Sequence, residues 1–297
     1  MKKKITLLLL FTSICVFSQK KLTKLIHKRT YTTLSSYKKN FGEKITKSDS
    51  LNFIIKGKDT LIPLPKDYVK PEGVLVEYEP KDSTFLEIYK DIVYKKHYQQ
   101  NNSNSKKLRM RLWKPKLKIY FTKSVDRTVK KELKNFANKL SNEIDSLNIS
   151  FVNNIEKSNY IIYGFNSQND YKYDNRIKSN NNDYYISWRG SKIYDCKLQI
   201  NSNSFKTKKE LVINSKILFL RSLGNLNFTN QLSSNHYFSN SYSINKQFSK
   251  IDLELIKYHY SYGICKGTDL KTFESNHRNA KMNIERTGRP YHFLHIN

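Results

Sequence analysis

The chain has 297 residues and a formal net charge of +29, because 54 Lys and Arg residues outnumber 25 Asp and Glu residues. Its length suits one large domain or two small ones. After the first residues no stretch approaches the roughly 18 apolar residues of a membrane span, which argues against an integral membrane protein. The positive charge favours polyanionic partners such as nucleic acid, anionic polysaccharide or a charged membrane surface.

The first 18 residues predict a secretory signal peptide. Three lysines precede an apolar run from Ile5 to Phe17, and the small residues Val16 and Ser18 suit a cleavage site. We therefore expect Sec-type export to the periplasm, the outer envelope or the exterior, with cleavage after Ser18. The segment is too short for a membrane span, and an uncleaved anchor is the alternative. The mature chain would keep a charge of +26, because the segment holds three lysines and no acid.

Residues 19–98 are expected to form a small β-rich N-terminal module, since four of the six prolines lie there among short β-rich runs. The run 53–62 predicts a hairpin that turns near Gly57, and the run 73–79 predicts a further strand. The apolar residues of 84–96 fit the period of a helix and that of a strand.

A polar stretch without aliphatic residues, 99–107, predicts a linker after this module. The basic run KKLRMRLWKPKLK follows at 106–118. It fits either a strand entering a sheet or a cationic patch in which Trp113 is a stacking platform.

Residues 108–268 predict an α+β domain in which helices pack on one sheet. The expected strands are 117–121, 149–152, 159–165, 183–188 and 196–201. Ser124 is expected to cap the helix after the first of these strands. The buried face of that helix recurs at helical spacing and comprises Val129, Leu133, Phe136, Ala137, Leu140 and Ile144.

A second helix is expected from Thr207 to about Leu223. Thr207 and Glu210 have the spacing of a capping box, in which each side chain bonds a backbone amide of the other residue. The second half of the helix is apolar on nearly every face, which indicates a buried position. We expect Gly224 to end the helix in the left-handed conformation.

Ser249 and Asp252 are expected to cap a last helix over 249–260. Beyond it, residues 269–297 are basic and predict an irregular tail.

This element order resembles the metzincin type of zinc metallopeptidase. It is more similar still to a bacterial family of exported zincin-like proteins of unknown function. The resemblance covers 108–268 and depends on the segments RSLGNLN (221–227) and SINKQFSKIDLELIKYHYSYGICKG (243–267). It implies a metzincin-like twisted mixed sheet with helices packed on it.

The metzincin motif is H-E-x-x-H-x-x-G-x-x-H, whose histidines bind zinc and whose glutamate activates the metal-bound water. Alignment on Gly224 puts Ile217 and Leu218 at the first histidine and the glutamate, and Arg221 and Asn227 at the other two histidines. Every catalytic position departs from the motif. There is also no methionine between positions 110 and 282 for the methionine turn. We therefore expect neither catalytic residues nor a metal or other cofactor at this helix.

Arg221 is unusual inside an apolar helix, because a buried guanidinium needs a carboxylate, a carbonyl cage or a route to solvent. One interpretation makes it a contact for an anionic ligand in the former substrate cleft. In the other, it pairs internally or extends to the surface.

The remaining histidines and cysteines leave further alternatives open. His236, His259 and His277 are far apart in the sequence, and an alternative metal site built from them competes with scattered exposed histidines. In an exported protein, Cys196 and Cys265 either form a disulfide or stay as two unrelated thiols.

Three functions remain for the chain. The first is a non-catalytic zincin-like protein that binds a partner or has a structural role in the cell envelope or exterior. The second is a cationic binder of an anionic polymer, either polysaccharide or nucleic acid. The third is a metallopeptidase with atypical ligands. Phosphate-binding loops, nucleophile elbows and dinucleotide fingerprints are absent from the sequence.

Overall fold

A computed structural model describes residues 31–42, 45–46, 50–57, 59–65, 73–96, 108–165, 172–178 and 180–295. The expected signal peptide and linker lie outside these ranges. The chain divides into two compact units, Met1–Pro71 and Glu72–Asn297. Within the described ranges, none of the helices combines the length and apolar character that crossing a membrane requires.

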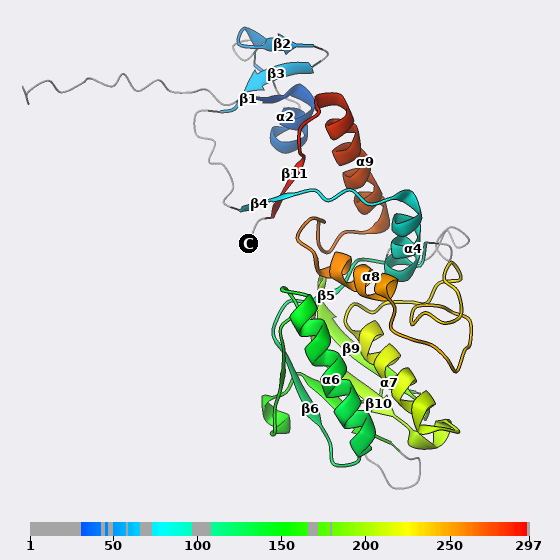
Figure 1. The fold of residues 1–297 in the computed structure, drawn as a ribbon. Coiled ribbons are helices and arrows are strands. Elements are labelled where there is room, and N and C mark those ends of the chain that lie inside the picture. Colours follow the sequence, from blue (N-terminus) through cyan, green and yellow to red (C-terminus); the bar gives the residue numbers. More distant parts are fainter. Residues whose placement is uncertain are drawn as a thin grey trace, which may run out of the picture. The chain divides into compact units, whose positions relative to one another are not determined.

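The first unit contains a small antiparallel sheet and one helix. Its strands are β1 (Tyr31–Thr33), β2 (Ile54–Lys56) and β3 (Asp59–Pro63), in the order β1-β3-β2, and its helix is α2 (Leu34–Phe41) (Figure 1). The predicted hairpin is confirmed, since β2 pairs with β3 and Gly57 turns the chain at φ +63°. Glycine adopts this left-handed conformation at no steric cost, because it has no Cβ atom.

The second unit is built on a six-stranded, mainly parallel sheet. Its strands are β5 (Leu112–Trp113), β6 (Leu117–Phe121), β7 (Ile149–Phe151), β8 (Tyr160–Gly164), β9 (Asp183–Arg189) and β10 (Lys192–Ile200). They lie in the order β5-β10-β8-β6-β7, and β9 pairs with β10 as the antiparallel strand. All five predicted strands are present. β10 begins four residues early, because a bulge between Ile193 and Asp195 interrupts the alternation that marks a strand.

Helices α6 (Arg127–Glu143) and α7 (Lys208–Ser222) lie side by side on one face of this sheet (Figure 1). The predicted apolar stripe of α6 is buried. The predicted cap is wrong by two residues, since Asp126 Oδ1 accepts from the amides of Thr128 (2.8 Å) and Val129 (3.2 Å). Ser124 is engaged elsewhere: its Oγ donates to the carbonyl of Gly164 on β8 (3.0 Å).

The capping boxes that begin α7 and α8 (Lys250–Tyr260) are confirmed. Helix α4 (Ser83–Tyr94) settles the ambiguity over 84–96 in favour of a helix. Two short 3-10 helices, Ile155–Lys157 and Ser202–Ser204, complete the connections. The fold is mixed α+β.

The boundary between the units lies at Pro71, not at residue 98 as the sequence analysis expected. Helix α4 is the reason, because it is part of the same apolar core as the sheet. Its core side chains are Phe85, Ile88, Tyr89, Ile92, Val93 and Tyr94. Strand β4 (Val74–Glu77) also belongs to the second unit, where it pairs with a strand from the end of the chain.

The predicted irregular tail after residue 268 is a helix and a strand, α9 (Leu270–Thr287) and β11 (His292–His295). Asp269 caps α9 by accepting from the amide of Thr272 (2.9 Å), and β11 pairs antiparallel with β4. Only Phe273, His277 and Ala280 of α9 are buried. Such a narrow stripe in a basic sequence gives a weak periodic signal.

Candidate functional site

The C-terminal end of α7 contains the helical positions that align with the metzincin zinc motif. Ile217 and Leu218 are buried at 4% and 8% exposure inside the apolar core and have no atom that binds a metal ion. Asn227 donates through Nδ2 to the carbonyl of Ile92 on α4 (2.9 Å), and its amide donates to the same oxygen. These side chains do not fit a zinc ion.

Gly224 does not end α7 in the left-handed conformation, and this prediction is wrong. Asn225, not Gly224, has a positive φ, of 55°. Glycine is required at 224 because His259 of α8 lies against it. A Cβ atom there would lie 2.6 Å from His259 Nε2 and 2.8 Å from a methyl carbon of Leu226.

His259 is fully buried and has both ring nitrogens bonded. Because the carbonyl of Arg111 accepts only, His259 Nε2 carries the proton and donates to it at 2.7 Å. Nδ1 therefore accepts from the hydroxyl of Tyr89 (3.2 Å). Burial lowers the pKa of His259 to about 3, so the ring is neutral at physiological pH.

The other histidines of the proposed alternative site lie elsewhere. His277 of α9 lies between the hydroxyls of Tyr258 (3.1 Å) and Tyr78 (3.0 Å), and burial lowers its pKa to about 4. His236 Nδ1 bonds Ser249 Oγ (2.8 Å). Among the described residues, no three His, Cys, Asp or Glu side chains form a group suited to a metal ion.

Arg221 is half-buried and is held by the loop that follows α7. Its Nε donates to the carbonyl of Leu226 (2.9 Å). Its guanidinium carbon lies 4.2 Å from the centre of the Phe228 ring and 5.8 Å from that of Tyr184 on β9. The interpretation that Arg221 pairs internally therefore holds for Nε, one of the three nitrogens of its guanidinium.

A second arginine lies near the same strand. The guanidinium of Arg111 stacks on Trp188 of β9, with 3.7 Å between its carbon and the ring centre. Burial raises the pKa of Tyr184 to about 12; the positive charges of Arg221 and Arg111 oppose that rise, and the negative charge of Asp183 adds to it. Both guanidinium groups therefore act on the same hydroxyl. We call Arg111, Tyr184, Trp188, Arg221 and Phe228 the arginine–aromatic cluster.

Four members of this cluster were missed by sequence reasoning. Arg111 lies in the basic run at 106–118, but the aromatic residue chosen there, Trp113, is buried at 2% exposure and donates to the carbonyl of Ser222 (3.3 Å). The exposed ring is Trp188, which lies 77 positions after Arg111. No local pattern links the two.

The two cysteines are not bridged, so the disulfide is the alternative that the structure contradicts. Cys196 is buried in the core of the sheet, whereas Cys265 packs in a separate cluster with Tyr78, Ala280 and Phe293. Burial raises the pKa of both thiols, which disfavours the reactive thiolate.

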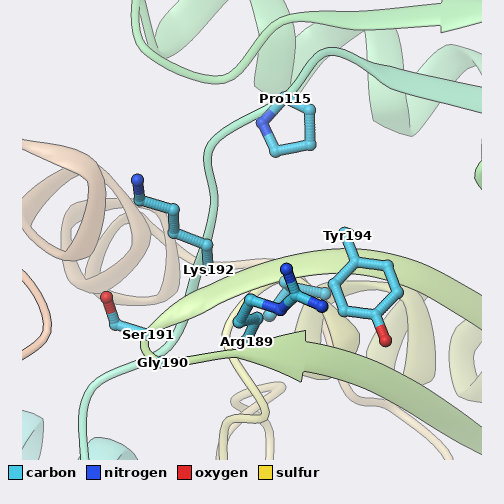
Figure 2. Close-up of a pocket in the computed structure, with 7 residues that line it drawn as sticks. Pro115, Arg189, Gly190, Ser191, Lys192 and Tyr194 are labelled. Carbon is cyan, nitrogen blue, oxygen red and sulfur yellow. The ribbon is translucent and has the colours of Figure 1, made fainter.

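A wide hollow lies at the turn between β9 and β10, with a volume of about 730 Å³. Arg189 and Lys192 line it together with Tyr194 and Pro115. Figure 2 shows the guanidinium of Arg189 beside the Tyr194 ring, while Lys192 extends away from both. A smaller hollow of about 430 Å³ is lined by three lysines and a single acid, Lys116, Lys118, Lys157 and Glu156.

Comparison of the sequence with protein-family models and with curated proteins finds no match.

Proposed function

We propose that this chain is an exported, non-catalytic zincin-like protein that acts by binding, with a partner in the cell envelope or exterior. The observation that carries the proposal is the chemistry at the end of α7. Where the resemblance calls for two histidines and a glutamate on the helix, the chain has Ile217, Leu218 and Arg221. Two of these are buried aliphatic side chains, and the third is a cation.

The order of elements supports the same proposal. A strand and a long helix come first, three more strands include an antiparallel one, and a further strand leads into the buried helix α7. This is the order on which the resemblance to metzincins depends. The metzincin-like form of the sheet is part of the proposal.

A metallopeptidase with atypical ligands is less well supported. His259 and His277 each have both ring nitrogens within hydrogen-bond distance of protein atoms, and they lie on different helices. Using either as a metal ligand would break a buried bond, which costs about 1–3 kcal/mol for each group left unsatisfied.

A second candidate function is the binding of an anionic polymer, which the two hollows favour. Their lining holds Arg189 and Lys192 in one hollow and three lysines in the other, against one glutamate. Exposed cations in shallow hollows suit backbone-type recognition of a polyanion.

Metal content tests the main proposal. The untagged mature protein is dialysed without chelator, and its metals are measured by elemental analysis alongside a peptidase assay. We expect a cooperatively folded protein with well under one zinc ion per chain and no peptide cleavage. About one zinc per chain, lost when His236, His259 or His277 is replaced, would overturn the proposal in favour of atypical ligands.

A further inference from the structure

We propose that the arginine–aromatic cluster is a binding site for an oxyanion group, either a free anion or a carboxylate or phosphate on a larger ligand. The inference rests on the proposed function and deepens it, because it names the chemistry that the former cleft recognises. It depends on three features of the cluster: the stacked guanidinium groups, their lack of an ion-pair partner among the described residues, and the exposed ring of Trp188.

The two arginines are held with their hydrogen-bond donors available. Arg111 lies over Trp188 at 3.7 Å and Arg221 over Phe228 at 4.2 Å. A guanidinium stacked on a ring keeps its N–H groups in its own plane, where they match the paired oxygens of a carboxylate or phosphate. The bond from Arg221 Nε to Leu226 fixes that plane.

In the part of the chain that the structure describes, the two arginines of the cluster have no direct ion-pair partner. Among the described residues, neither Arg111 nor Arg221 has a carboxylate within ion-pair distance. Lys246 lies 5.7 Å from the centre of the Phe228 ring, but it donates to two backbone carbonyls and interacts with the charge of Asp252. A bound anion would stabilise two partly buried guanidinium groups that lack an ion-pair partner.

The buried acid of α8 is already engaged. Asp252 is fully buried and accepts from the amides of Tyr237 (3.2 Å), Phe238 (3.2 Å) and Ser249 (2.9 Å). Its negative charge therefore stabilises the loop before α8, and it forms no bond with either arginine.

Trp188 makes the site reachable. Trp188 is 40% exposed on β9, which in the described part of the chain pairs with β10 alone. An apolar or sugar ring on the ligand has this aromatic surface beside the guanidinium of Arg111. The lysines in the hollows have flexible stems and suit diffuse attraction, whereas the stacked arginines suit a discrete group.

Trp188 also gives a direct readout, because the only other tryptophan, Trp113, is buried. We would titrate the full mature chain with inorganic phosphate and, separately, with glucuronate, at constant ionic strength in chloride, and follow tryptophan emission. We expect a saturable change with each probe, which is absent in Trp188→Phe. Tighter binding of glucuronate would indicate a carboxylated sugar as the source of the group, and tighter binding of phosphate a phosphorylated ligand or the free ion.

Charge-matched variants decide whether the cluster is responsible. Arg111→Gln and Arg221→Gln should each weaken binding by about tenfold or more, as expected for a lost charge-assisted pair. The control Arg127→Gln removes an exposed arginine at the start of α6 and should change the midpoint by less than about twofold. If Arg221→Gln does not fold, Arg111→Gln carries the test alone.

The proposal is overturned if the emission does not respond, or if all three arginine variants respond like the unmodified chain. Neither result changes the metal content, so failure of the anion site is distinguishable from failure of the proposed function. If the protein contains zinc but still responds to the anions, the proposed function fails and the anion site stands.

Discussion

The last turn of α7 has two sides that differ in how their polar groups are satisfied. On the inner side, Ser222 Oγ bonds the hydroxyl of Tyr160 (2.6 Å), the carbonyl of Leu223 accepts from Tyr260 (2.7 Å), and His259 closes over Gly224. On the outer side, Arg221 lies among aromatic rings and has no carboxylate partner among the described residues. The same turn of α7 thus carries polar groups that are all hydrogen-bonded on one side and, on the other, a guanidinium without an ion-pair partner in the described chain.

This difference separates the residues that maintain the fold from those that are free to act. Buried polar groups are costly unless bonded, and the inner network bonds each of them, so it serves the structure. Among the described residues, the outer charge is stabilised only by aromatic rings and one carbonyl, and a bound anion would stabilise it further. Variants on the inner side should therefore change stability, and variants on the outer side should change binding.

The largest effect is expected from Gly224→Ala. The new methyl group would lie 2.6 Å from His259 Nε2, so the ring must move away from Gly224 and its bond to the carbonyl of Arg111 weakens. We expect a loss of about 2–4 kcal/mol in the free energy of unfolding, from overpacking together with a weakened buried bond. Urea denaturation followed by circular dichroism measures it.

A double variant tests whether His259 is the cause. In the His259→Ala background the ring is gone, and Gly224→Ala should cost less than half as much as in the unmodified chain. Equal costs in both backgrounds would show that the contact with Leu226, or the backbone itself, limits this position.

Acid sensitivity is the next largest effect. His259 has a folded pKa of about 3, below the ordinary value of 6.5, so the unfolded chain binds the proton more readily. The stability from the neutral ring is complete above pH 6.5 and is lost as the pH falls towards 3. At pH 5 the loss from His259 is about 2 kcal/mol, and His277, with a folded pKa of about 4, adds a loss of about the same size. The free energies of unfolding at pH 7 and pH 5 should therefore differ by about 4 kcal/mol, which denaturation at the two pH values measures.

Two variants assign that loss. His259→Gln should be less stable at pH 7 but should lose about 2 kcal/mol less between pH 7 and pH 5. His292→Gln removes an exposed histidine of β11 and should leave the acid sensitivity unchanged. An undiminished acid loss in His259→Gln would place the sensitivity elsewhere, for example at His277.

The contrast between the two sides also explains what the sequence could predict. Short-range signals were sufficient for the five strands predicted between residues 117 and 201, for the stripe of α6 and for both capping boxes, because each depends on residues close together in the sequence. The role of Gly224 was misjudged because its reason is His259, which lies 35 positions further along the chain. Local rules favour a left-handed glycine at a helix end, and the contact with α8 outweighs them here.

The arginine–aromatic cluster was beyond local reasoning for a similar cause. Arg221 stood out because a charge inside an apolar helix breaks the binary pattern. Arg111 and Trp188 are each ordinary in their own segments, one in a basic run and one in a β-strand. They meet because β5 and β9 both pair with the start of β10, and no local sequence pattern predicts that pairing.

The smallest effect on stability is expected from Arg221→Leu, which tests most directly whether the outer side of the turn is dispensable for the fold. The substitution loses the Nε bond to Leu226, worth about 1 kcal/mol, but removes an unpaired charge and adds apolar contact with Phe228. The free energy of unfolding should change by less than about 1 kcal/mol. Asn227→Leu, six residues further along the chain, should cost more because it abolishes the side-chain bond to the carbonyl of Ile92 and removes no unpaired charge. Thermal melting of both variants in parallel decides the matter: a sharper drop for Arg221→Leu than for Asn227→Leu would make Arg221 a structural residue and place the anion-binding role on Arg111 alone.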